Sequence, residues 1–281
     1  MSIPPVEVVV LGSGTPRPDP GRGGSALAVV AGRDWLLVDC GRAATQRAID
    51  AGLDLTALVA VALTHHHSDH VSDLATLATT RWTAGATSPL VVIAPEGPTS
   101  RFASRCLDAY GDQAFYAQST EAAGPRPRLA VQAFEPTPTV TAVYEGGAWR
   151  LASVLVDHHP VTPAVGYLVE RDGCRVAVSG DTAVGDGMRA LARDVDVLVH
   201  ETLHPARVPA DLLAWNAGAD AVGALAAAAS PATLVLTHLL PAPTDPAHER
   251  SYLDEVRRGG YQGPTVVASD LVRIPVRSRP A

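Results

Sequence analysis

The chain has 281 residues, of which 47% are hydrophobic and 18% are charged, and this composition is typical of a globular protein with a sizeable core. No apolar run is long enough to cross a bilayer, and the first residues lack the basic and cleavage regions of a signal peptide, so we expect a cytoplasmic protein without a membrane partner. The net charge of −7 argues against a nucleic-acid partner, because basic side chains on phosphates supply most non-specific affinity for nucleic acids.

Short apolar segments rich in β-branched residues recur along the chain and are bounded by turn residues. This pattern predicts buried strands, which in chain order are VEVVVLGSG, DWLLVDCG, LVAVAL, PLVVIAP, LASVLV, CRVAVSG, VDVLV and ATLVL. Helical patterns separate several of them, including a helix that opens at Asp69 and continues through Leu77 and another between Leu212 and Thr233. Strands that alternate with helices favour a layered α/β fold.

Two segments are rich in turn residues. In LGSGTPRPDPGRGGS, Arg17 stands where a dinucleotide-binding loop has its third glycine, and no G-K-S/T of a P-loop follows. We expect a wide loop there, which can line a pocket. The proline-rich residues 124–140 predict a long loop rather than a linker between domains. The chain is therefore predicted to form one domain, residues 1–281.

Side chains that can bind metals follow five of the predicted strands. Because the carboxyl ends of strands in one sheet lie along one edge, where α/β folds build their sites, these side chains are predicted to meet. They are His65, His67, Asp69 and His70, then His158 and His159, then Asp181, then His200 and Glu201, and finally His238. The sequence therefore predicts a metal centre at this edge.

The types of ligand restrict the metal. Neutral imidazole and carboxylate without thiolate suit Zn(II), Fe(II) or Mn(II) better than copper or an iron–sulfur cluster. The candidate ligands exceed what one tetrahedral ion can use, whereas two ions roughly 3.5–4 Å apart that share a carboxylate would use seven of them. In an extended segment His65 and His67 point the same way and His66 points the opposite way, so His66 is not expected to be a ligand.

The segment THHHSDH, with His65, His67, Asp69 and His70 in the order H-x-H-x-D-H, resembles the motif of the metallo-β-lactamase superfamily. The aspartate of SGDT and the histidine of LTHLLP follow in that family's order, and LGSGTPRPDPGRGGS, LLVDCG, RWTAGATSPLVV and VLVHET look like the branch that holds RNase Z and the arylsulfatase-like hydrolases. The resemblance implies an αββα sandwich with two mixed sheets flanked by helices. It also implies a metal-dependent hydrolase.

The resemblance also implies roles for individual residues. His65, His67 and a third histidine would hold one ion; Asp69, His70 and His238 would hold the other, with Asp181 between them. The segment HHPVTPAVGY fits the family pattern H-x-P-V-x-P-A-x-x-Y when His158 is first, so we favour His158 over His159, which would become a pocket residue. The ions are expected to be two Zn²⁺, with Mn²⁺ or Fe²⁺ as alternatives. Asp69 would orient or deprotonate the nucleophile, and Glu201 is a candidate hydrogen-bond acceptor for a ligand histidine.

The chain departs from RNase Z at two places. RNase Z proteins carry a tRNA-gripping arm between the third histidine and the bridging aspartate, but His158 and Asp181 are only 23 positions apart, with room for a loop and two short strands. RNase Z also pairs the histidine of its HEAT motif with a histidine in a later HST motif, whereas this chain keeps His200, Glu201 and Thr202 but has WNAGADAV downstream.

These departures and the acidic charge lead us to expect a small-molecule substrate. The predicted reaction is hydrolysis of an ester-type bond, in a phosphodiester, a carboxylic ester or a sulfate ester, with nucleic acid disfavoured as a substrate. The alternatives are an RNase Z-like endoribonuclease that processes tRNA 3′ ends, a lactonase, and an iron-dependent oxygenase of the same fold. The sequence leaves a homodimer open.

Overall fold

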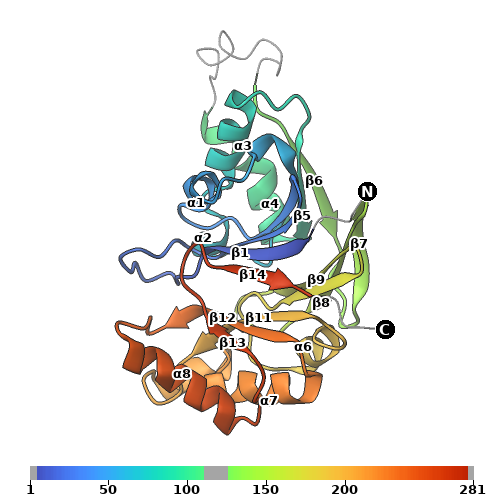
Figure 1. Cartoon of the computed structure of the whole chain (residues 1–281). Helices are drawn as coiled ribbons and strands as arrows, with labels where there is room; N and C mark the ends of the chain where they lie inside the picture. Colours follow the sequence, from blue (N-terminus) through green and yellow to red (C-terminus); the bar gives the residue numbers. More distant parts are fainter. Residues whose placement is uncertain (1–4, 111–125, 278–281) are drawn as a thin grey trace.

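The computed structural model describes residues 5–110 and 126–277, and in these ranges it contains two seven-stranded mixed sheets (Figure 1). The first sheet has the order β14-β1-β2-β3-β4-β5-β6, with bounds Arg273–Val276, Val6–Gly12, Ala26–Ala31, Asp34–Val38, Leu58–Ala62, Leu90–Pro95 and Leu129–Phe134. The second has the order β13-β12-β11-β10-β9-β8-β7, with bounds Thr265–Val267, Thr233–Leu240, Val197–Leu203, Cys174–Val178, Val165–Arg171, Trp149–Leu155 and Thr141–Gly146.

The alternation of side chains along each strand separates two cores on the two faces of a sheet. In β1, Val8 and Val10 pack in the core between the sheets, whereas Val9 and Leu11 pack in the core beneath the outer helices. Because both faces of β1 are covered, its sequence is a nearly continuous apolar run. A third core lies between the second sheet and its helices.

Helices cover the outer face of each sheet. The first sheet is covered by α1 (Ala44–Asp50), α3 (Leu74–Thr83) and α4 (Pro98–Arg105), and the second by α6 (Asp186–Leu191), α7 (Ala219–Ala229) and α8 (Pro246–Arg258) (Figure 1). The order of layers is helices, sheet, sheet, helices, so the predicted αββα sandwich is confirmed.

Two predicted elements are wrong in detail. The single helix expected from Asp69 through Leu77 is two helices, α2 (Ser68–Val71) and α3, because the backbone N–H of Asp73 donates to the Cys40 carbonyl and leaves the helical pattern. The long loop expected over residues 124–140 contains β6, which pairs in parallel with β5. Residues 124–125 of that loop lie outside the described part of the chain.

The strand directions bring the polar strand ends to one edge. Parallel pairing of β3 with β4, and of β10 with β11 and β11 with β12, places the carboxyl ends of each set side by side. Strand β8 is antiparallel to β9, which is antiparallel to β10, so β8 ends at the same edge as β10. Among the described residues, no helix is both long and apolar enough to cross a membrane.

Two glycines allow close backbone contact at this edge. A Cβ on Gly41, just after β3, would lie 1.9 Å from the backbone oxygen of Asp69, and a Cβ on Gly24 would lie 2.6 Å from the same oxygen. Both distances are shorter than a non-bonded carbon and oxygen can approach each other. The loops around α2 therefore depend on glycine at both positions.

We predict that Gly41→Ala lowers the free energy of unfolding by about 1–3 kcal/mol, because the added methyl group forces the backbone of Asp69 away. Urea denaturation of the metal-free protein measures this change without the contribution of bound ions. Gly185→Ala is the matched control, because a Cβ there meets no atom within 4 Å. Equal midpoints for the two variants would contradict the prediction.

Candidate metal centre

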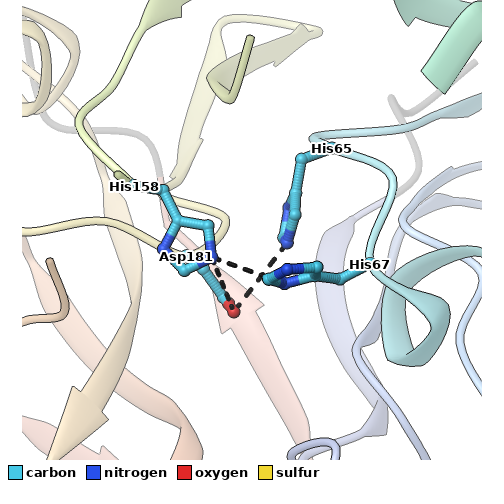
Figure 2. Close-up of side chains that lie close together, drawn as sticks. All are labelled: His65, His67, His158 and Asp181. Atoms are coloured by element: carbon cyan, nitrogen blue, oxygen red, sulfur yellow. Dashed lines mark hydrogen bonds and ion pairs between the residues drawn. The ribbon is translucent and has the colours of Figure 1, made fainter. Parts of the chain in front are cut away.

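Four side chains from distant segments converge at the common edge of the two sheets. His65 and His67 come from the segment after β4, His158 from the segment after β8, and Asp181 from the segment after β10 (Figure 2). His158 Nε2 lies 3.4 Å from His67 Nδ1 and 3.9 Å from Asp181 Oδ2. His65 Nε2 is also 3.9 Å from Asp181 Oδ2. One potential ligand atom of each residue thus faces a common space.

A second group lies beside the first. It consists of Asp69, His70 and His238, all buried. His238 Nε2 lies 3.2 Å from Asp69 Oδ2, and His70 Nε2 lies 3.6 Å from the same oxygen. Asp181 reaches both histidines, with Oδ1 3.2 Å from His70 and Oδ2 3.4 Å from His238. Asp181 therefore lies between the two groups.

These distances fit divalent ions in tetrahedral coordination. Two ligand atoms that are each about 2.0–2.2 Å from a tetrahedral ion lie about 3.3–3.6 Å apart. Several spacings within the two groups, from 3.2 to 3.9 Å, are close to that range, and the potential ligand atoms of each group all lie within 4.8 Å of one another. Nε2 of His65 and Oδ1 of Asp69 are buried and have no hydrogen-bond partner among the described residues, which is costly unless a ligand is present. The donor atoms therefore suit two ions.

The local structure around α2 explains how one short segment serves both groups. His67 has extended dihedral angles (φ −60°, ψ 144°) and immediately precedes the helix. Asp69 and His70 then lie in its first turn, so the chain changes direction between His67 and Asp69. His66 lies outside both groups, as the alternation of side chains predicts.

Asp39, at the end of β3, is a site residue that the sequence did not single out. Its Oδ2 accepts a hydrogen bond from His70 Nδ1 at 2.7 Å, which leaves Nε2 of His70 for an ion. Thr64 Oγ1 donates a hydrogen bond to Asp39 and can accept one from His65 Nδ1 at 3.0 Å. The Nε2 atom of His65 is therefore also free to bind an ion. The aspartate of DCG could have been found by the same rule that found the others, since it directly follows a strand.

His158 is oriented by a backbone group. Its Nδ1 donates to the carbonyl oxygen of Trp215 at 3.3 Å, and Nε2 faces His67 and Asp181. His158 is 7% exposed, whereas the neighbouring His159 is exposed and belongs to neither group. The geometry therefore favours His158 as the third histidine.

Burial and charge set the protonation states in the two groups. Burial lowers the pKa of His65 well below its usual value, so the ring is neutral and can bind a cation. Burial also disfavours a charge on His70, but the carboxylates of Asp181 and Asp39 outweigh it and hold the pKa of His70 well above its usual value. Burial raises the pKa of Asp181, and this effect is outweighed by His238 and His70, so that its pKa lies well below the usual range.

Glu201 forms a third potential metal-binding group with Asp181 and His238, and His200 precedes it in β11. Oε1 of Glu201 accepts a hydrogen bond from the Thr182 backbone, and Oε2 lies 3.8 Å from His238 Nδ1, which is too long for a hydrogen bond. Burial and the nearby Asp181 raise the pKa of Glu201 well above its usual value. His200 donates from Nδ1 to the Glu201 carbonyl, and burial lowers the pKa of His200 to about 4.

Two further histidines lie away from both groups. His204 bonds Ser251 through Nε2 at 3.0 Å, and the ring of His248 stacks on Tyr252. Both are buried and belong to no potential metal-binding group among the described residues.

A cleft of about 340 Å³ opens onto the candidate centre. His67, His158, Asp181 and His238 form part of its wall. The rest comes from the loop after β1, the segment after His158, the region before α7 and the ends of β11 and β12, and includes Thr15, Pro16, Arg17, His159, Pro160, Val161, Leu203, Leu212, Trp215, Asn216 and Leu240. A substrate in this cleft would lie directly beside the ligands.

Comparisons with known proteins agree with this geometry. The sequence profile described as Metallo-beta-lactamase superfamily matches residues 19–239. A protein named Ribonuclease Z from Mycobacterium bovis (strain BCG / Pasteur 1173P2) is 34% identical over 292 residues, covering 98% of this chain and 99% of that protein. Ribonuclease Z from Mycobacterium marinum is 33% identical and covers 98% of this chain and 100% of that protein.

Solved structures share the fold. The metallo-β-lactamase fold protein YhfI from Bacillus subtilis superposes with a TM-score of 0.76 at 19% identity, covering 96% of this chain and 99% of that one. The short form of human tRNase Z superposes with a TM-score of 0.73 at 20% identity, with the same coverage. At these identities the superpositions establish the fold alone.

We predict that metal binding near neutral pH releases protons. The pKa of His70 lies above its usual value in the ion-free protein, so below that pKa the ring carries a proton that an ion must displace, and affinity falls as pH falls. Calorimetric titration with Zn²⁺ in two buffers of different ionisation enthalpy measures the number of protons released. Asp39→Asn removes one of the charges that raise the pKa of His70, and fewer protons should leave. An equal proton release by both proteins would contradict the role given to Asp39.

Proposed function

This chain belongs to the metallo-β-lactamase superfamily and is a metal-dependent hydrolase, and we propose that it is a ribonuclease Z-type endoribonuclease that processes the 3′ ends of precursor tRNA. The observation that carries the proposal is the 33–34% identity to proteins named Ribonuclease Z over nearly the full length of both chains. The carboxylate and imidazole groups that line the cleft suit hydrolysis of a phosphodiester.

The prediction of a small-molecule ester hydrolase, and with it the exclusion of a nucleic-acid substrate, is wrong. It depended partly on the missing arm between His158 and Asp181. The alignment with the M. bovis Ribonuclease Z covers 99% of that protein in 292 residues, so that protein has no long insertion relative to this chain either. The absence of an arm therefore does not distinguish this chain from proteins of that name. The relatives reported above carry no arylsulfatase name.

We propose that the seven side chains divide as the two groups do. His65, His67 and His158 would hold one ion, and Asp69, His70 and His238 the other, with Asp181 contributing to both. We propose zinc as the metal, since imidazole and carboxylate ligands without thiolate in tetrahedral spacing suit it, while Mn²⁺ and Fe²⁺ accept the same ligands.

Asp69 can act on the attacking water. Its Oδ2 faces His238 and His70, whereas its buried Oδ1 has no hydrogen-bond partner among the described residues. Oδ1 can therefore orient a water molecule and accept its proton. Divalent ions, when bound, lower the pKa of water and stabilise the negative charge that develops on the phosphate.

We also propose that residues 1–281 form one domain, because strands of both sheets contribute to the central core. Val8 and Val10 of the first sheet and Val176 and Val199 of the second belong to the same cluster. Residues 1–4, 111–125 and 278–281 lie outside the described part of the chain.

We predict that the zinc-loaded protein cleaves precursor tRNA at its 3′ side and that Asp69→Asn lowers kcat by about 10²–10⁴-fold, because the substituted amide can neither accept a proton nor replace the carboxylate as a proposed metal ligand. Gel analysis of end-labelled precursor tRNA under single-turnover conditions measures both results. His66→Ala is the matched control from the same segment, and it should retain activity because His66 belongs to neither group. Failure of the wild-type protein to cleave precursor tRNA would reject the proposed function.

We predict that the purified protein binds two divalent ions per chain and that His158→Ala loses about one of them, whereas His159→Ala keeps both. His158 Nε2 faces His67 and Asp181, while His159 is exposed on the wall of the cleft. Elemental analysis after growth with added zinc, manganese or iron measures the number and identity of the ions. The reverse order of the two variants would overturn the choice of His158.

A further inference from the structure

The cleft beside the candidate metal centre has an aromatic wall, which we define as Trp215 and His159. The two rings lie 6.4 Å apart between centroids, with 51° between their planes, and both line the cleft. They come from distant segments, since His159 follows β8 and Trp215 follows the short helix Ala210–Ala214. Trp215 is half-buried and His159 is exposed, so both rings can be reached from the cleft.

The backbone of Trp215 is fixed relative to the metal centre. Its carbonyl oxygen accepts the hydrogen bond from His158 Nδ1. The next two residues are held as well. The Asn216 side chain donates to the Leu212 carbonyl at 3.0 Å, and the Ala217 carbonyl accepts from the Leu203 backbone N–H at 2.8 Å. The ring of Trp215 is therefore attached to a backbone segment that also orients a candidate ligand.

The same cleft contains one cationic side chain with no partner. Arg17 is the only arginine among the residues that line the cleft, and the chain has no lysine. The Arg17 side chain is exposed and makes no ion pair or hydrogen bond with any residue in the described ranges 5–110 and 126–277. A guanidinium group suits recognition of a phosphate.

We propose that this cleft binds a single unstacked nucleotide of the RNA, the one that flanks the scissile phosphodiester, with its base on Trp215 and its phosphate near Arg17. The assignment rests on the proposed function. Protein sites that read single-stranded RNA stack splayed bases on aromatic side chains. The cleft volume of about 340 Å³ suits a ligand of this size. Because His67, His158 and Asp181 line the same cleft, a nucleotide bound there lies next to the reacting phosphate.

Local binding of this kind suits a chain without an arm. Only β9, β10 and their connecting turns lie between His158 and Asp181, so no extended element there can hold the body of a tRNA. Contacts with the flanking nucleotide then carry a larger share of the affinity. Stacking of a base on an aromatic side chain contributes about 1–3 kcal/mol.

The first test compares Trp215→Ala with Trp215→Phe on precursor tRNA that is intact or abasic at each position flanking the cleavage site. Trp215→Ala should lower kcat/KM on intact RNA by about 5- to 140-fold, which corresponds to the loss of one stacked base, chiefly through KM. Trp215→Phe, which keeps an aromatic ring, should retain most of the wild-type kcat/KM. At one flanking position the abasic RNA should be cleaved equally by the wild type and by Trp215→Ala. Equal penalties on intact and abasic RNA at every position would overturn the proposal.

The second test uses the protein's own fluorescence. The other three tryptophans, Trp35, Trp82 and Trp149, are at most 3% exposed, so only Trp215 can contact a ligand. In the zinc-loaded wild-type protein, adenosine 5′-monophosphate should quench the emission, and ribose 5-phosphate, which has no base, should not. The Trp215→Phe variant should lose the quenching. Quenching that persists without Trp215, or no quenching at all, would overturn the proposal.

The third test concerns Arg17. Arg17→Ala should weaken precursor tRNA binding equally for intact and abasic RNA and reduce its dependence on salt concentration, as loss of a phosphate contact does. Arg105→Ala, which removes an exposed charge on α4 outside the cleft, is the matched control and should leave the salt dependence unchanged. Equal effects of the two variants would show that Arg17 does not contact the phosphate. Absence of tRNA cleavage with base-dependent quenching intact would reject the proposed function but keep the nucleotide site.

Discussion

Both groups of the candidate metal centre depend on the hydrogen bonds that the carboxylate of Asp39 accepts. It bonds His70 directly and reaches His65 through the hydroxyl of Thr64. One buried charge therefore fixes the ring orientation of a candidate ligand in each group. The carboxylate is 2% exposed, and its hydrogen bonds from Thr64 and His70 offset the cost of its burial.

The fold supplies this arrangement through strand direction and close backbone packing. Asp39 follows β3 and His65 follows the parallel strand β4, so both lie at the same edge of the first sheet. The strands of the second sheet that end beside that edge contribute Asp181, which follows β10, and His238, in β12. The two groups form only when the sheets are packed face to face, so formation of the central core and formation of the site are linked. Gly41 then allows the turn after Asp39 to touch the backbone of Asp69.

The sequence predicted the layers and the converging side chains because both follow from short-range patterns. Period-two alternation in β1 identifies a strand, and a polar residue after such a strand marks an edge of the sheet. Asp39 was missed because a single aspartate two positions before a glycine also suits an ordinary turn. The aromatic wall was missed for a different reason: Trp215 and His159 are 56 positions apart, and no local pattern relates them. The break after α2 depends on a hydrogen bond to Cys40, which is equally non-local.

The error about the substrate has an electrostatic cause. The net charge of −7 sums groups over the whole surface, but in physiological salt exposed charges are screened beyond about 8 Å. A phosphate in the cleft therefore responds to the groups that line it, among which Arg17 is cationic. The acidic side chain that lines the cleft, Asp181, is a proposed metal ligand, and a divalent ion bound to it would reverse the local sign of the charge. An acidic chain can thus have a cleft that attracts RNA, and whole-chain charge does not decide between a nucleic acid and a small ester as substrate.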